Sequence, residues 1–179
     1  MKKIILFIIV SIILYSCKSN DLHTTNYFSS VTIDTLLQDK ISIRALLIDK
    51  EKIWYAADQS RFGCIDLKSN QKKEIQIPAD KNREYRSIAQ TKEHIFILSV
   101  ANPALLYRIS KKDLSYELVY QETHEKVFYD SMQFWNDMEG IAIGDPIEGV
   151  FSLIKTIDGG ETWEKSPAKL LPKLVDGED

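Results

Sequence analysis

The sequence has little of what disulfide-bonded, metal-binding or nucleic-acid-binding proteins require. It contains two cysteines, three histidines and 23 basic against 26 acidic residues, a formal net charge of −3. His23, His94 and His124 show no metal-ligand spacing, so we predict no metal site. Phosphate backbones need a concentrated basic surface, and no basic stripe is present in the sequence, so we expect no nucleic-acid partner.

Cofactor motifs and helical patterns are missing as well. The sequence has no Gly-x-Gly-x-x-Gly after a strand, no phosphate loop and no Cys-x-x-Cys, so we predict no cofactor. No stretch after residue 17 has a helical period with caps, which argues against a helical fold. What is present is an ordinary globular composition, 44% hydrophobic and 27% charged over 179 residues. That length is sufficient for one domain with a sizeable core.

The N-terminus differs from the rest of the chain. Lys2 and Lys3 precede an apolar run over residues 4–15, which Ser16 and Cys17 follow. A basic start, a short apolar run and a small residue are typical of a secretory signal peptide, here residues 1–16. The run is too short to span a bilayer comfortably. The place of Cys17 resembles a bacterial lipoprotein processing site, in which the cysteine is diacylated and becomes the mature first residue.

This resemblance implies an exported protein, anchored by lipid at the cell membrane or outer membrane, on the periplasmic or surface side. Residues 17–26 are polar and aperiodic, and we predict that they form a tether. The alternative is a plain signal peptide followed by an incidental cysteine. After Cys17 only Cys64 remains, so the mature chain has no intramolecular disulfide, and its apolar surroundings predict a buried thiol.

An internal repeat decides the predicted fold class. Similar segments begin at residues 41, 84 and 128, and Arg44, Arg86 and Asp130 fall at matching places, 42 and 44 residues apart. Each unit divides into four short strands punctuated by turn residues. The strands are expected at 41–48, 52–58, 61–68 and 73–78, at 84–91, 94–100, 104–111 and 116–121, and at 126–136, 139–145, 150–156 and 162–165.

Four antiparallel strands in 40–45 residues is the period of a propeller blade. We therefore predict an all-β fold, a partial β-propeller over residues 27–179. It has about three four-stranded antiparallel blades, at 41–78, 84–121 and 126–167, and one leading strand over residues 27–36.

Residues 156–163, Thr-Ile-Asp-Gly-Gly-Glu-Thr-Trp, are the clearest local signal. An aspartate at the start of a tight loop accepts hydrogen bonds from the following N–H groups, and glycine supplies the positive φ. The segment resembles the Asp-box of bacterial neuraminidase repeats, Ser/Thr-x-Asp-x-Gly-x-Thr-Trp, which is matched by Thr156, Asp158, Gly160, Thr162 and Trp163. In that family the box lies on the outer hairpin of a blade, so we interpret these residues as structural. In the second unit, Tyr116 is expected to take the place of Trp163.

The wider run over residues 128–146 resembles the photosystem II assembly-factor type of β-propeller. Some bacterial members of that family are labelled only as oxidoreductases or neuraminidase-repeat proteins. The resemblance covers about residues 41–175 and implies the N-terminal half of a longer ring, because closed propellers have roughly four to eight blades. Open edges would expose unpaired backbone and apolar faces, so we predict that the isolated chain self-associates or is poorly soluble.

The inner strands of a propeller line its channel, which makes Arg44, Arg86 and Asp130 the candidate channel-lining binding residues. Two arginines on neighbouring blades can grip a carboxylate, as they do in sialidases. A sialidase also needs a third arginine, a tyrosine nucleophile paired with a glutamate, and an acid aspartate. Asp130 replaces the third arginine and no tyrosine–glutamate pair can be assigned, so we interpret the three residues as an inter-blade charge network.

Two further groups of residues are interpreted as structural. Trp54 and the Phe134–Trp135 pair are expected to pack between blades rather than to form a sugar platform. Asp145 and Glu148 lie in a turn that we interpret as solvated rather than as a cation site.

The sequence thus favours a non-catalytic binding or assembly scaffold. We expect an unknown protein or polysaccharide partner at the channel mouth, and contact with a membrane through the lipid anchor. The alternative is a sialidase-like glycoside hydrolase, or another enzyme of the kind labelled oxidoreductase, with its remaining site residues in a missing C-terminal half.

Overall fold

The computed structural model describes residues 28–77 and 82–174. The predicted signal peptide, Cys17 and the tether lie outside these residues. Contacts divide the chain into two units, Met1–Thr35 and Leu36–Asp179. The described residues of the first unit, 28–35, contain no helix or strand.

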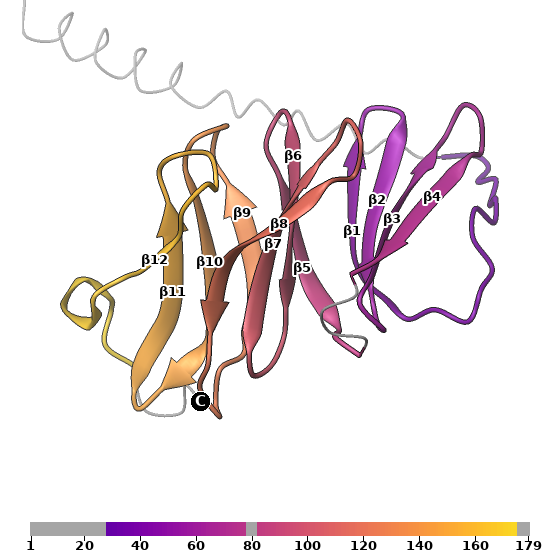
Figure 1. Ribbon diagram of the computed structural model, residues 1–179. Helices are drawn as coiled ribbons and strands as arrows, with labels where there is room; N and C mark the ends of the chain where they lie inside the picture. The colour runs from indigo at the N-terminus through magenta and orange to yellow at the C-terminus, as the bar shows by residue number, and fades with distance from the viewer. Residues whose placement is uncertain (1–27, 78–81, 175–179) are drawn as a thin grey trace, which may run out of the picture. The chain divides into compact units, whose positions relative to one another are not determined.

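The second unit is built from three four-stranded antiparallel sheets, in which each strand pairs with the next along the chain (Figure 1). The first blade contains β1 (Ile43–Asp49), β2 (Lys52–Ala57), β3 (Arg61–Asp66) and β4 (Lys72–Gln76). The second contains β5 (Tyr85–Gln90), β6 (His94–Ser99), β7 (Ala104–Ser110) and β8 (Tyr116–Glu122). The third contains β9 (Tyr129–Phe134), β10 (Gly140–Ile147), β11 (Val150–Thr156) and β12 (Glu164–Lys165). The predicted fold class and the division into twelve blade strands are confirmed.

The first strands of the three blades lie next to one another, because β1 contacts β5 and β5 contacts β9. The blades therefore share one inner side. Two apolar clusters fill the spaces between them. One joins β2 and β3 of the first blade to β5–β7 and includes Trp54, Phe62 and Ile95; the other joins the second blade to the third and includes Phe96, Leu106 and Phe134. A fully buried side chain of this size contributes about 1.5–3 kcal/mol.

The leading strand predicted over residues 27–36 is not formed by its described part, residues 28–36. A strand needs a neighbour for its N–H and C=O groups, and the three described sheets draw all their strands from residues 43–165. The chain just after this segment has a different role. Leu37, Ile41 and Ile43 pack against Tyr55 and Ala57 and cover part of the outer face of the first blade.

The packing predicted for three aromatic residues is confirmed for two of them. Trp54 is fully buried and stacks on Phe62 at 5.8 Å between ring centroids, and Phe134 lies 4.7 Å from Phe96. The prediction is wrong for Trp135, whose surface is 66% exposed. Trp135 directly follows β9, and its side chain points to the face of the third blade opposite the second blade, as Gln133 does two residues earlier.

The only helical element in the described residues is a 3₁₀ turn over Ala168–Leu170. Across residues 28–77 and 82–174, no helix is long and apolar enough to cross a membrane.

Candidate functional site

Arg44, Arg86 and Asp130 are the extra residues of three β-bulges. In each blade the pairing between the first two strands skips one residue near the start of the inner strand, at these three positions. A bulge leaves the extra residue unpaired and redirects its side chain. The shared spacing in the sequence therefore corresponds to a shared backbone irregularity, which presents one charged side chain per blade.

These side chains form a continuous row of ion pairs through Glu84. Arg44 Nε lies 3.3 Å from Glu84 Oε1, and Arg86 Nη2 lies 3.0 Å from the same oxygen. Arg86 Nη1 lies 3.8 Å from Asp130 Oδ1, and the guanidinium sits 5.1 Å from the centre of the Phe128 ring. The row links the three blades at one end of their inner strands.

The carboxylate that the two arginines share is one of the chain's own: Arg44 contacts Glu84 through Nε and Arg86 contacts it through Nη2. Burial, followed by the charge of Asp145, raises the pKa of Asp130, while the charge of Arg86 opposes that rise. Sequence reasoning missed Glu84, since the matching positions in the other blades are Ser42 and Phe128 and give no repeated charge.

The Asp-box residues lie in the loop between β11 and β12. Asp158 accepts hydrogen bonds from Thr156 Oγ1 at 2.7 Å, Thr162 N at 3.0 Å and Thr162 Oγ1 at 2.6 Å. Thr156 Oγ1 also accepts from Gly160 N at 2.9 Å. Burial opposes ionisation of Asp158, but the hydrogen bonds from Thr162 and Thr156 prevail and lower its pKa to about 2. The buried Trp163 packs edge-on against Phe134, 5.7 Å between centroids.

The other two blades keep part of this loop chemistry. In each blade the last residue of the third strand accepts a hydrogen bond from the N–H two residues further on: Asp66 from Lys68, Ser110 from Lys112 and Thr156 from Asp158. Asp113 extends the likeness in the second blade, where hydrogen bonds from Ser115 lower its pKa to about 2.

The place of Trp163 is not taken by Tyr116 in the second blade, so that prediction is wrong. Tyr116 is exposed, with its ring against Tyr107. Leu114 instead packs on the cluster that contains Trp54. Leu114 has a φ of 63°, and this turn directs its side chain inward two residues before Tyr116.

Three tyrosines of the described residues donate a hydrogen bond to a glutamate, which the sequence did not reveal. Tyr120 OH donates to Glu122 Oε2 at 2.9 Å, and two fully buried tyrosines form the other pairs. Tyr55 OH donates to Glu74 Oε2 at 2.5 Å, and Tyr129 OH donates to Glu122 Oε2 at 2.7 Å. Burial, followed by the hydrogen bond to the carboxylate, raises the pKa of both tyrosines. A nucleophilic phenolate needs the opposite shift, so both pairs serve packing. Glu122 also pairs with Lys165 of β12 and so joins the second and third blades.

One signal could have suggested the first pair. In the registered strands Gly63 lies directly between Tyr55 and Glu74, and a Cβ at Gly63 would overlap the Tyr55 ring. A glycine in the middle of an apolar strand often marks such a close approach.

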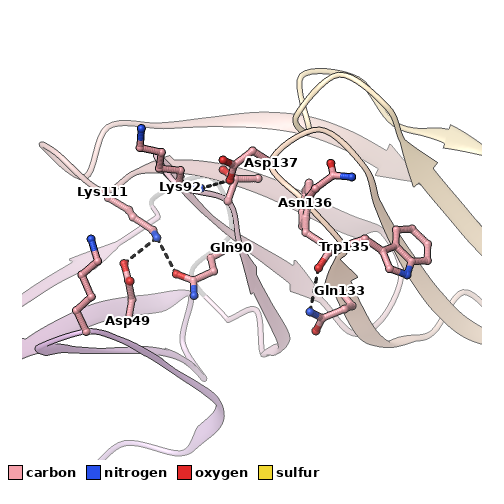
Figure 2. Close-up of a pocket in the computed structure, with 11 residues that line it drawn as sticks. Asp49, Gln90, Lys92, Lys111, Gln133, Trp135, Asn136 and Asp137 are labelled. Carbon is pink, nitrogen blue, oxygen red and sulfur yellow. Dashed lines mark hydrogen bonds and ion pairs between the residues drawn. The ribbon is translucent and has the colours of Figure 1, made fainter.

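Loops from all three blades line an open pocket of about 390 Å³ at the opposite end of the inner strands (Figure 2). Asp49 ends β1, Gln90 ends β5, and residues 133–137 comprise the end of β9 and the three residues after it. Lys111 reaches in from the β7–β8 loop, with its ammonium 2.8 Å from Asp49 Oδ2 and 2.7 Å from Gln90 Oε1. No residue of this pocket was predicted as a binding residue, because its members share no sequence motif.

The remaining predicted positions carry no site in the described residues. Cys64 is buried, as predicted, and burial raises the pKa of its thiol. Asp145 and Glu148 belong to no cluster of three possible metal ligands, and none exists elsewhere in the described part of the chain. His23 lies outside the described residues.

No family model matches the chain, and no curated protein matches it. Solved structures do resemble it. YCF48 bound to a D1 peptide is 11% identical, with a TM-score of 0.56 over 70% of this chain and 39% of the other. The WD40 repeats of RRP9 are 13% identical, with a TM-score of 0.55 over 73% of this chain and 40% of the other.

The chain folds as part of a β-propeller. It spans about two fifths of the length of those two structures, 39% and 40%. At such low identity the likeness shows the fold of the propeller and leaves its ligand to be argued from its own residues. The match to YCF48 agrees with the sequence resemblance to assembly-factor propellers.

Proposed function

We propose that this propeller is a lipid-anchored, extracytoplasmic binding or assembly scaffold without catalysis of its own. The observation that carries the proposal is the use of the inner-strand charges. Arg44, Arg86 and Asp130 are spent in ion pairs that tie the blades together, while the loops at the other end form an open polar pocket. A scaffold needs a rigid body and an accessible rim, and this arrangement supplies both.

The likeness to YCF48, whose solved structure holds a D1 peptide, supports a binding role by analogy of fold. The leader supports the proposed location. Residues 1–16 would direct export, Cys17 would carry the acyl chains, and residues 17–26 would hold the propeller away from the lipid surface.

Site-specific photo-crosslinking in the intact membrane tests the binding role. A benzophenone side chain at Lys92 of the pocket should give a discrete adduct with a protein or a polysaccharide. The same group at Lys73, exposed on the outer strand β4, should give none. Absence of an adduct from Lys92, together with turnover of a glycan by the purified chain, would contradict the proposal.

The anchor is tested separately by Cys17→Ser. The variant should leave the membrane fraction and lose metabolic labelling with palmitate, because one thioether-linked diacylglycerol and its partner chain are needed for stable attachment. If the wild type is not labelled with palmitate, the proposed lipid anchor is wrong, but the proposed scaffold function is unaffected.

A further inference from the structure

We propose that the pocket at the ends of β1, β5 and β9 binds an anionic saccharide unit, such as a uronate of a polysaccharide. The inference rests on the proposed binding role and names the ligand class for it. The pocket is concave and is shared by three blades. Its volume, about 390 Å³, lies within the range of small-ligand sites.

Charge in the pocket favours an anion. The chain as a whole carries a net charge of −3, yet three lysines and two aspartates line the pocket. Both carboxylates already accept hydrogen bonds, Asp49 from Lys111 and Asp137 from the backbone N–H of Lys92. Lys111 and Asp49 balance each other, so Lys50 and Lys92 stand against Asp137 alone, and the lining keeps an excess of one positive charge for an added carboxylate ligand.

The three cations differ in how firmly they are held. Lys111 is fixed by Asp49 and Gln90, so one ammonium N–H remains for a ligand at no further ordering cost. Lys50 and Lys92 are exposed, and their ammonium groups take part in no ion pair with the described residues. Lys111 is therefore preorganised, while Lys50 and Lys92 can change rotamer to reach a ligand. This combination suits a small anionic group such as a carboxylate.

The uncharged lining favours a saccharide over a peptide. None of the eleven lining residues is Leu, Ile, Val or Met. Of the two aromatic residues, Phe134 is buried in the core and Trp135 points away from Lys111, so little apolar surface is left for the side chain of a peptide ligand.

The pocket offers amides instead. Asn136 is engaged by Met138 and Glu139. Gln90 Nε2 and Gln133 Oε1, however, form no hydrogen bond with the described residues, so one donor and one acceptor remain for the hydroxyl groups of a sugar ring.

Trp135 lies on the rim, with its indole directed away from Lys111 and over the third blade (Figure 2). A flat apolar ring there faces away from a unit held beside Lys111. It is positioned to stack against the next unit of a longer chain. Trp135 should therefore matter for oligomers and be silent for a single unit.

Binding of oligogalacturonates of one to six units to the full-length chain in detergent, followed by calorimetry, tests the proposal. The double variant Lys50→Gln/Lys92→Gln should bind the trimer roughly tenfold more weakly. The control Lys68→Gln/Lys169→Gln removes the same charge at exposed lysines outside the pocket and should bind as the wild type does. Trp135→Ala should weaken binding of the trimer and leave the monomer unchanged.

Neutral cello-oligosaccharides and poly-glutamate of equal charge complete the design. Uronates should bind more tightly than both. Unchanged binding in Lys50→Gln/Lys92→Gln, tighter binding of poly-glutamate, or no uronate binding would each overturn the proposal. If no uronate binds while crosslinking from Lys92 still captures a partner, the proposed saccharide ligand is wrong and the proposed scaffold function is retained.

Discussion

Gly160 satisfies two constraints of the Asp-box loop at once. Its φ is +82°, and a Cβ at this position would overlap the ring of Phe96 in the neighbouring blade. Gly149, in the β10–β11 turn, has a similar φ of +77° but nothing within 4 Å of a built Cβ. A side chain at Gly149 would therefore meet backbone strain alone, whereas a side chain at Gly160 would meet both backbone strain and steric overlap.

We expect Gly160→Ala to lower the free energy of unfolding by about 3 kcal/mol, and Gly149→Ala by about 1 kcal/mol. The difference arises because only the former must displace Phe96. Urea denaturation followed by tryptophan fluorescence measures both. Equal losses in the two variants would show that Phe96 yields without cost.

Asp158 gives the loop a pH dependence. Its pKa, about 2 in the folded chain, lies below the ordinary value near 3.9, so its stabilisation is present above about pH 4 and is lost as the pH falls toward 2. Asp158→Asn should lower the free energy of unfolding by about 1 kcal/mol at pH 7. The difference in stability between the variant and the wild type should become smaller below about pH 4. Thermal melts across this range measure it. Asp34→Asn, at an exposed aspartate, is the control. A stability difference between Asp158→Asn and the wild type that does not change with pH would show that the charge of Asp158 does not stabilise the loop.

At the scale of the element, each inner strand has a β-bulge near its start, at Arg44, Arg86 or Asp130. The charged side chain at the bulge joins its blade to a neighbouring blade through an ion pair. The repeat spacing was sufficient to align Arg44, Arg86 and Asp130, because strands alternate strictly and blades repeat. The bulge itself was not predictable, since one unpaired residue leaves no pattern in composition. The partner Glu84 was also not predictable, because it lies outside the regular register.

The row of ion pairs at the bulges predicts that two substitutions shift the pKa of Asp130 in opposite directions. Asp145→Asn removes a charge that raises the pKa of Asp130, so this pKa should fall; Arg86→Gln removes the opposing charge, so it should rise. Carbon-detected NMR titration of the Asp130 carboxyl measures both. Since the folded pKa is already raised, protonation of Asp130 favours the folded state as the pH falls through it. The pKa of Asp158 serves as the internal reference, and an Asp130 pKa that moves in the same direction in both variants would refute the account.

At the scale of the whole molecule, the second of the three described blades is packed on one face by the first blade and on the other by the third. The first and third blades each present an outer face. Leu46 and Ile48 of β1 are 62% and 69% exposed, and Ile143 of β10 is 39% exposed. Ile143 occupies the position that Leu98 holds in the second blade, where the residue is buried against the third blade. The outer face of the third blade is therefore apolar where a neighbouring blade would pack.

We expect the chain to self-associate through these faces. Ile143→Lys should shift it toward the monomer in sedimentation velocity, because a buried lysine is costly in such a contact. Leu46→Lys should do the same only if the contact joins a first blade to a third blade, and Leu118→Lys on the outer strand β8 is the control. A wild type that sediments as a monomer at all concentrations would contradict the prediction.

The sequence by itself determined the blades. Alternating apolar residues, turn residues at short intervals and a repeat of 42 and 44 residues specify four-stranded sheets, because side-chain alternation and turn chemistry are local properties. It also determined the Asp-box loop, in which the hydrogen bonds of the Thr156 and Asp158 side chains join residues at most four positions apart. The tertiary structure alone decided that Glu84 joins the arginines, that Tyr55 and Tyr129 bind glutamates of other strands, and that Lys111 meets Asp49 62 residues away. Such contacts depend on how one blade is set against the next, and no local pattern encodes that placement.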